Sequence, residues 1–177
     1  MRRSGVISAL CVLFLAALSP HLALASDLAA SGEGAARGDV IVIQGAVEHP
    51  RTLTLADLMR EPATTEAVSL KTGKGVLTGS YTGVLLWTLL QKAGIRMSSE
   101  IRNDVMRHTI VVTAKDGYST VLSVAEIDPE FGGERALIAY AKDGQQLSDK
   151  RGFARLIFPA DKSAGRAISG VWSITVR

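Results

Sequence analysis

Basic side chains gather near the C-terminal end of the sequence. Lys150, Arg151 and Arg155 lie within one six-residue run, and Lys162 and Arg166 follow shortly after. Guanidinium and ammonium groups placed in this way can converge on a bound anion, such as a phosphate or sulfate oxyanion, through charge-assisted hydrogen bonds. The alternative is that these charges flank a strand and face solvent. The spacing alone leaves both interpretations open.

The rest of the sequence lacks the familiar catalytic constellations. It contains no Gly-x-Ser-x-Gly elbow, no phosphate-cradling glycine loop followed by Lys-Ser or Lys-Thr, and no His-Glu-x-x-His. His49 and His108 lie far apart, and neither has a second ligand at the spacing that metal sites use. We interpret each as a lone surface or hydrogen-bonded histidine. The sequence therefore predicts no catalytic residue and no metal ligand.

The first 25 residues predict a secretory signal peptide. Arg2 and Arg3 precede an apolar run at residues 6–18, and small residues at 23–25 predict cleavage between Ala25 and Ser26. The apolar run is too short to span a bilayer. We expect a periplasmic or secreted protein, exported by the ordinary route, with the twin-arginine route as the alternative.

Removal of this signal has two chemical consequences. Cys11 is the sole cysteine of the 177 residues, so the exported chain would carry no thiol, disulfide or thiolate metal ligand. Its 18 basic residues would face 17 acidic ones, which gives no argument for nucleic acid or an anionic membrane surface as a partner. The small polar residues at 26–38 predict a flexible lead-in, and residues 39–177 predict one domain.

Residues 78–94 form the most apolar stretch of the exported chain and predict a buried helix with an approach loop. From Val84 to Ala93 apolar side chains cover most of a helical circumference, and Gly94 is suited to end the helix. In the preceding loop, Gly79 and Gly83 allow close approach of the backbone to a ligand or to a neighbouring strand.

The remaining pattern predicts an α+β domain with mostly antiparallel sheet. Thr54 and Ser123 are expected to cap two short helices, at residues 55–59 and 124–127. Asp116-Gly117 and Asp143-Gly144 are typical of hairpin turns. Strands are expected at residues 40–43, 64–70, 109–114, 118–122, 136–141, 156–159 and 171–176.

The order of these landmarks resembles the oxidoreductase molybdopterin-binding domain, which has the sulfite oxidase-like fold. The resemblance covers essentially residues 39–177. It rests on five landmarks in order: residues 81–94, Asp116-Gly117-Tyr118, residues 137–147, residues 152–159, and Arg166 before the last strand.

This resemblance implies a molybdenum site held by a cysteine thiolate in the segment before the buried helix, and basic side chains on the pterin phosphate. Residues 68–72, where the thiol is expected, contain Ser69 and Thr72 instead. A hydroxyl is a much poorer ligand, because it must lose a proton of high pKa. Arg155 and Arg166 match the family's arginines, whereas Ser169 replaces its lysine. These three residues are the predicted cofactor-binding, anion-contacting side.

Three functions are compatible with a chain that keeps the family's arginines but lacks its cysteine and lysine. The first is a cofactor-free exported module that binds a small anionic ligand or a periplasmic protein, with no molybdenum chemistry. The second is a molybdopterin-dependent oxidoreductase with atypical metal ligation, or one that holds the pterin without a protein–metal bond. The third is a docking subunit of a sensor or redox complex, for which Tyr118 at a hairpin tip is the candidate contact. Whether the chain is an enzyme stays open.

Overall fold

The computed structural model describes residues 40–148 and 152–177. The predicted signal peptide, its cleavage point, the lead-in, and Lys150 and Arg151 of the basic run lie outside this range. The elements in chain order are β1 (Ile41–Gly45), β2 (Arg51–Leu53), α1 (Leu55–Met59), β3 (Thr64–Thr72), β4 (Gly75–Leu85), α2 (Leu86–Ala93), η1 (Asp104–Arg107), β5 (Thr109–Ala114), β6 (Ser119–Ser123), α3 (Val124–Ile127), β7 (Leu137–Lys142), β8 (Gln145–Gln146), β9 (Arg155–Ile157), η2 (Ala164–Arg166), β10 (Ile168–Ser169) and β11 (Val171–Val176).

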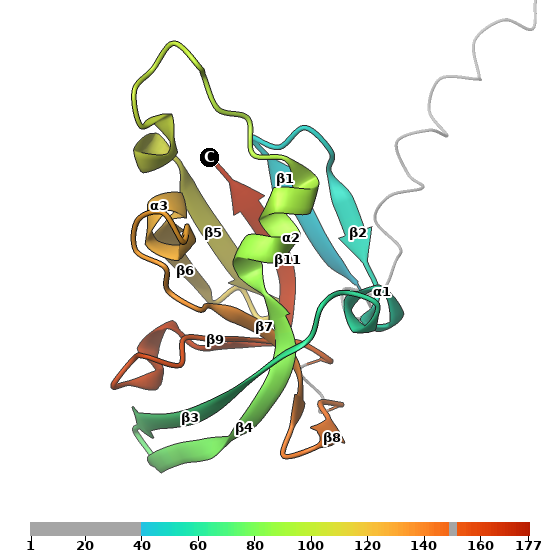
Figure 1. Cartoon of the computed structure of the whole chain (residues 1–177). Coiled ribbons are helices and arrows are strands. Elements are labelled where there is room, and N and C mark those ends of the chain that lie inside the picture. Colours follow the sequence, from blue (N-terminus) through green and yellow to red (C-terminus); the bar gives the residue numbers. More distant parts are fainter. Residues whose placement is uncertain (1–39, 149–151) are drawn as a thin grey trace, which may run out of the picture. The chain divides into compact units, whose positions relative to one another are not determined.

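These strands form two sheets (Figure 1). One has the order β2-β1-β11-β5-β6, and the other has the order β10-β9-β7-β4-β3 with β8 beside β7. Every strand pair is antiparallel except β1 with β11. The predicted α+β class with mostly antiparallel sheet is confirmed. No helix in the described ranges is long and apolar enough to cross a membrane.

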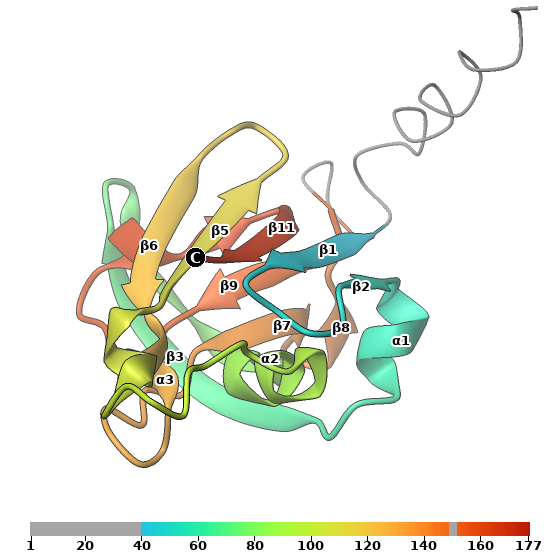
Figure 2. The ribbon, with the colours of Figure 1, turned by 90° about the horizontal axis from the view of Figure 1, so that it is seen from above.

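The main hydrophobic core lies where α2 meets both sheets (Figure 2). Leu86, Leu89, Leu90 and Ala93 of α2 are fully buried in it. A smaller core covers the other face of the second sheet. Its buried members are Val68, Leu70, Tyr81, Leu137, Ala139 and Ile157. Strand β7 contributes to both cores, which explains its uninterrupted apolar sequence.

The predicted approach loop before α2 was wrong. Residues 78–85 are the second half of β4, which pairs with β3 on one side and, from Tyr81 onward, with β7 on the other. The helix begins at Leu86, so Val84 and Leu85 belong to the strand. Gly94 ends the helix as predicted, with a positive φ of 67°.

The two glycines of this strand approach protein and not a ligand. A Cβ on Gly83 would lie 2.2 Å from the backbone oxygen of Ile138. A Cβ on Gly79 would lie 2.3 Å from the Cε of Lys142. Both glycines therefore let β4 pack closely against β7 and the turn that follows it.

The two predicted helix caps are present. Thr54 accepts a hydrogen bond from the N–H of Asp57, whose carboxylate accepts one from the N–H of Thr54. The Ser123 hydroxyl accepts a hydrogen bond from the N–H of Ala125. The second cap fixes the start of α3, which carries Glu126 in its first turn.

Candidate functional site

The end of the β3–β4 hairpin and the η2 segment enclose an open pocket of about 380 Å³. The two sides are joined by backbone contacts, because Lys71 forms a parallel bridge with Ser163 and donates its N–H to the oxygen of Lys162. Figure 1 shows the hairpin running beside the red C-terminal segments. The pocket is lined by Lys71, Thr72, Gly73, Ser163, Ala164 and Gly165.

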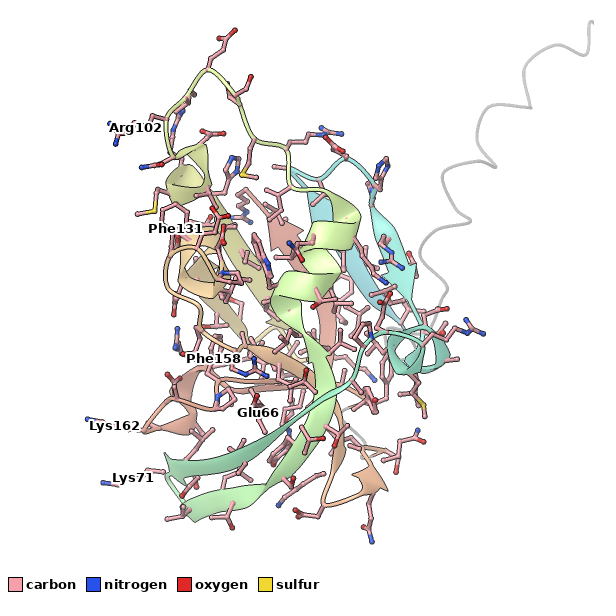
Figure 3. All side chains as sticks on the ribbon, viewed as in Figure 1. Glu66, Lys71, Arg102, Phe131, Phe158 and Lys162 are labelled. Carbon is pink, nitrogen blue, oxygen red and sulfur yellow. The ribbon has the colours of Figure 1, made fainter. Side chains whose placement is uncertain are left out.

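Lys71 lines this pocket, and Lys162 directly precedes the lining residue Ser163. Both side chains project toward the same side of the molecule (Figure 3). Lys162 is exposed. Neither ammonium group has an ion-pair partner among residues 40–148 and 152–177. One available positive charge therefore belongs to the lining of the pocket, and a second is carried by the residue next to that lining.

Arg166 is engaged by two carboxylates. Its Nη2 and Nε donate to Asp161 at 2.7 and 3.0 Å, and its Nη1 pairs with Glu126 of α3. The guanidinium carbon also lies 4.0 Å from the centre of the Phe158 ring. The hydrogen bond to Asp161, followed by that to Glu126, raises the pKa of Arg166 above its ordinary value. This cation is already neutralised by its own chain.

A third carboxylate belongs to the same neighbourhood. Burial, followed by the negative charge of Asp161, raises the pKa of Glu134, although the charge of Arg166 acts the other way. Its buried Oε1 has no hydrogen-bond partner in the described part of the chain. An external anion near Arg166 would therefore meet Asp161, Glu126 and Glu134 at once.

Arg155 and Ser169 are brought together. The two residues are cross-strand neighbours in the β9–β10 pair. Nη1 of Arg155 donates to the Tyr81 hydroxyl at 3.1 Å, and its guanidinium carbon lies 5.9 Å from the centre of that ring. Tyr81 is fully buried in the smaller core. Arg155 thus contacts a core tyrosine of β4, and Arg166 contacts the carboxylates of Asp161 and Glu126.

Ser169 lies in a second, smaller pocket of about 180 Å³, beside Tyr118. Tyr118 comes from the turn between β5 and β6, and its hydroxyl donates to the backbone oxygen of Gly165 at 2.6 Å. Tyr118 therefore links the pocket that holds Ser169 to a lining residue of the pocket at Gly165. The sequence marked Tyr118 as a contact for a partner, whereas its contact to Gly165 was not predicted.

Neither hydroxyl that stands near the expected thiol position is arranged as a ligand. Ser69 is exposed, on the side of β3 opposite to the buried Val68 and Leu70. The Thr72 hydroxyl donates to the oxygen of Gly75 at 2.9 Å and accepts from the N–H of Lys74 at 3.1 Å. Its hydrogen-bonding capacity is used within the hairpin turn.

Comparison with known families decides what this domain is. The family model described as oxidoreductase molybdopterin binding domain matches residues 39–176. The chain belongs to this family. The resemblance seen in the sequence is confirmed, and so is the sulfite oxidase-like fold.

Individual relatives agree with the family. An uncharacterised oxidoreductase of Bacillus subtilis, YuiH, is 27% identical over 120 residues, which cover 66% of this chain and 54% of the relative. The sulfane dehydrogenase SoxCD of Paracoccus pantotrophus aligns with a TM-score of 0.62 and 19% identity, over 77% of this chain and 37% of that one. This chain therefore spans about half of the first protein and less of the second, and the likeness to the second is one of fold.

The residues of this family member do not fit a molybdenum centre of the thiolate type. The whole sequence has one cysteine, at position 11, which lies outside the matched residues. Hydroxyls hold molybdenum poorly in its place. No group of three or more His, Cys, Asp or Glu side chains within the described ranges is arranged for a metal ion. Arg166, the arginine that the resemblance assigns to the pterin phosphate, carries two carboxylates instead.

Proposed function

We propose that this domain is an exported binding module that keeps the molybdopterin-binding fold without molybdenum chemistry. The observation that carries the proposal is the pair of ion pairs that Arg166 forms with Asp161 and Glu126. An arginine that must receive a phosphate cannot also be saturated by two carboxylates without a cost to binding. The absence of a thiol from the domain supports the same conclusion.

The pocket between the β3–β4 hairpin and η2 is the place where we expect a ligand. Its volume of about 380 Å³ suits a small molecule. Lys71 in its lining and Lys162 beside the lining residue Ser163 favour an anionic group, while Gly73, Ala164 and Gly165 leave the backbone accessible. We therefore propose a small anionic ligand that is held by ammonium and backbone groups.

Two measurements test the absence of metal chemistry. Protein isolated from the periplasm or medium of its own organism should contain no stoichiometric molybdenum by elemental analysis, and acid release should give no pterin fluorescence. A stoichiometric molybdenum signal would establish the alternative, an oxidoreductase with atypical ligation. Pterin without molybdenum would show that the fold retains the organic part of the cofactor alone.

A titration with pyrophosphate tests the pocket. We expect the double variant Lys71→Ala/Lys162→Ala to bind pyrophosphate at least about tenfold more weakly, since two charge-assisted contacts are lost. Arg102→Ala is the matched control, because Arg102 is exposed and lies near the opposite end of the domain (Figure 3). Equal affinities in all three proteins would remove the ligand from this pocket.

The β5–β6 hairpin supports a second candidate function, docking of a protein partner. Tyr118 and Val121 are 53% and 59% exposed, and β6 is an edge strand. An exposed edge strand with apolar side chains can pair with a strand of another protein. Crosslinking in the native organism from position 121 should then capture one partner, and crosslinking from Arg102 should not.

A further inference from the structure

A second cationic pocket lies where β11 ends and β5 begins. It has a volume of about 490 Å³ and is formed by the connection between α2 and β5 together with Arg177, directly after β11. Its lining includes three arginines: Arg96, Arg107 and Arg177. None of these was singled out in the sequence, because they lie far apart in the chain.

The charges in this pocket are unequal. Asp104 carries the single acidic side chain of its lining, and Arg107 pairs with it at 3.4 Å. Arg96 and Arg177 are exposed and have no ion-pair partner within the described ranges. Two guanidinium groups are therefore available to an anion, and each can donate a bidentate pair of hydrogen bonds.

The walls that carry these arginines are anchored by backbone hydrogen bonds. The N–H of Arg96 donates to Ala46 at 3.0 Å, and Ile95 forms a bridge with Val47. Arg177 exchanges two hydrogen bonds with Thr109, at 2.8 and 2.9 Å. Preorganised positions reduce the entropy that binding must cost.

Asp104 holds together the segment between α2 and β5 through two contacts. Its Oδ2 accepts from the N–H of Ser98 at 2.8 Å and contacts Nε2 of His108 at 3.2 Å. The hydrogen bond from Ser98, followed by that with His108, lowers the pKa of Asp104. Its carboxylate is thus occupied by protein donors, and it competes weakly for the guanidinium groups of Arg96 and Arg177.

Apolar side chains stand beside the charges. Met97 and Ile101 line the pocket and are 52% and 39% exposed. Apolar surface next to unpaired guanidinium groups matches a ligand with an acidic head and an apolar body. Methionine adapts to irregular apolar shapes.

We propose that this pocket binds a small amphipathic carboxylate, with the carboxylate on Arg96 and Arg177 and the apolar body on Met97 and Ile101. This site is separate from the pocket at η2. The proposal therefore stands or falls independently of the function proposed above.

Octanoate and octanamide are matched probes for this proposal, because they differ mainly in the charge of the head group. We expect saturable binding of octanoate, and binding of octanamide at least about tenfold weaker, since the charge-assisted hydrogen bonds are lost. Backbone amide shifts in two-dimensional NMR should cluster at Arg96, Met97, Ile101 and Arg177. Shifts centred on Gly165, or equal affinities for the two probes, would overturn the proposal.

Variants distinguish the contribution of the arginine charges to binding from that of the apolar side chains. Arg96→Ala/Arg177→Ala should weaken octanoate binding at least about tenfold and leave octanamide unchanged. Arg102→Ala should change neither, because Arg102 belongs to the same connection but does not line the pocket. All three arginines are exposed, so thermal unfolding should stay near that of the unaltered protein. Undiminished octanoate affinity in the double variant would refute the site.

Discussion

The hydroxyl of Tyr118 donates a hydrogen bond of 2.6 Å to the backbone oxygen of Gly165 and so ties the tip of a hairpin in one sheet to the η2 segment beside the other. The half-exposed ring lines the pocket of Ser169, and Gly165 lines the pocket of Lys71. One hydrogen bond therefore joins a lining residue of each pocket.

Tyr118→Phe should destabilise the domain by only about 1 kcal/mol, the usual net value of a single hydrogen bond. Its main effect should be local: amide exchange at residues 163–166 should become faster, because η2 loses its link to the hairpin. Hydrogen exchange followed by mass spectrometry measures this. Val121→Ala, on the same hairpin, is the control and should leave exchange at η2 unchanged. Uniformly unchanged exchange in Tyr118→Phe would mean that the link holds nothing in place.

Gly83→Ala should be strongly destabilising, by about 1–3 kcal/mol or more, because the new methyl group would overlap the backbone of β7. Gly73→Ala is the matched control. A Cβ at that position has no other atom within 4 Å, so its unfolding free energy should stay within about 0.5 kcal/mol of the original. Urea unfolding of the two variants compares them directly. Equal midpoints would contradict the close packing of β4 on β7.

Leu89→Asp should abolish folding. Leu89 of α2 is fully buried in the main core, where an unpaired carboxylate costs several kcal/mol, a large part of the roughly 5–15 kcal/mol that stabilises a domain. Gln91→Asp introduces the same charge on the exposed side of the same helix and should be tolerated. Circular dichroism and thermal melting distinguish them. A soluble Leu89→Asp protein with an unchanged melting transition would disprove the role assigned to α2.

Deprotonation of Glu134 should lower the stability of the domain as the pH rises above about 4. Because burial raises the pKa of this carboxyl in the folded protein, the folded state binds its proton more tightly than the unfolded state. Its contribution is complete below the pKa of the unfolded chain, and it is lost as pH rises through the higher pKa of the folded one. Glu134→Gln should remove this loss, so the difference between variant and original should grow in the variant's favour from pH 4 upward. Urea unfolding at a series of pH values measures it; a constant difference would count against the shift.

Features that depend on neighbouring residues were predicted correctly from the sequence. Thr54 and Ser123 cap their helices, and the strands at 109–114 and 171–176 have the predicted bounds, because these features depend on neighbouring residues. Val84 and Leu85 were assigned to the helix wrongly. A continuous apolar run fits a buried helix as well as a strand with both faces covered, and the pairing partner β7 lies more than fifty residues away.

The candidate site was harder to predict for a related reason. Arg155 and Ser169 are cross-strand neighbours, and their relation follows once the β9–β10 hairpin is known. Arg166 was identified as a cation, but the carboxylates that engage it are those of Asp161 and of Glu126, which lies forty residues earlier. A single sequence gives the charge of a side chain and not which distant charge lies beside it.

The pairing of β1 with β11 joins the first strand of the domain to the last, and β11 lies in the middle of its sheet, between β1 and β5. A growing chain cannot complete this sheet before Val171–Val176 has been synthesised, so the closing of the first sheet is a late step that joins the two ends of the domain.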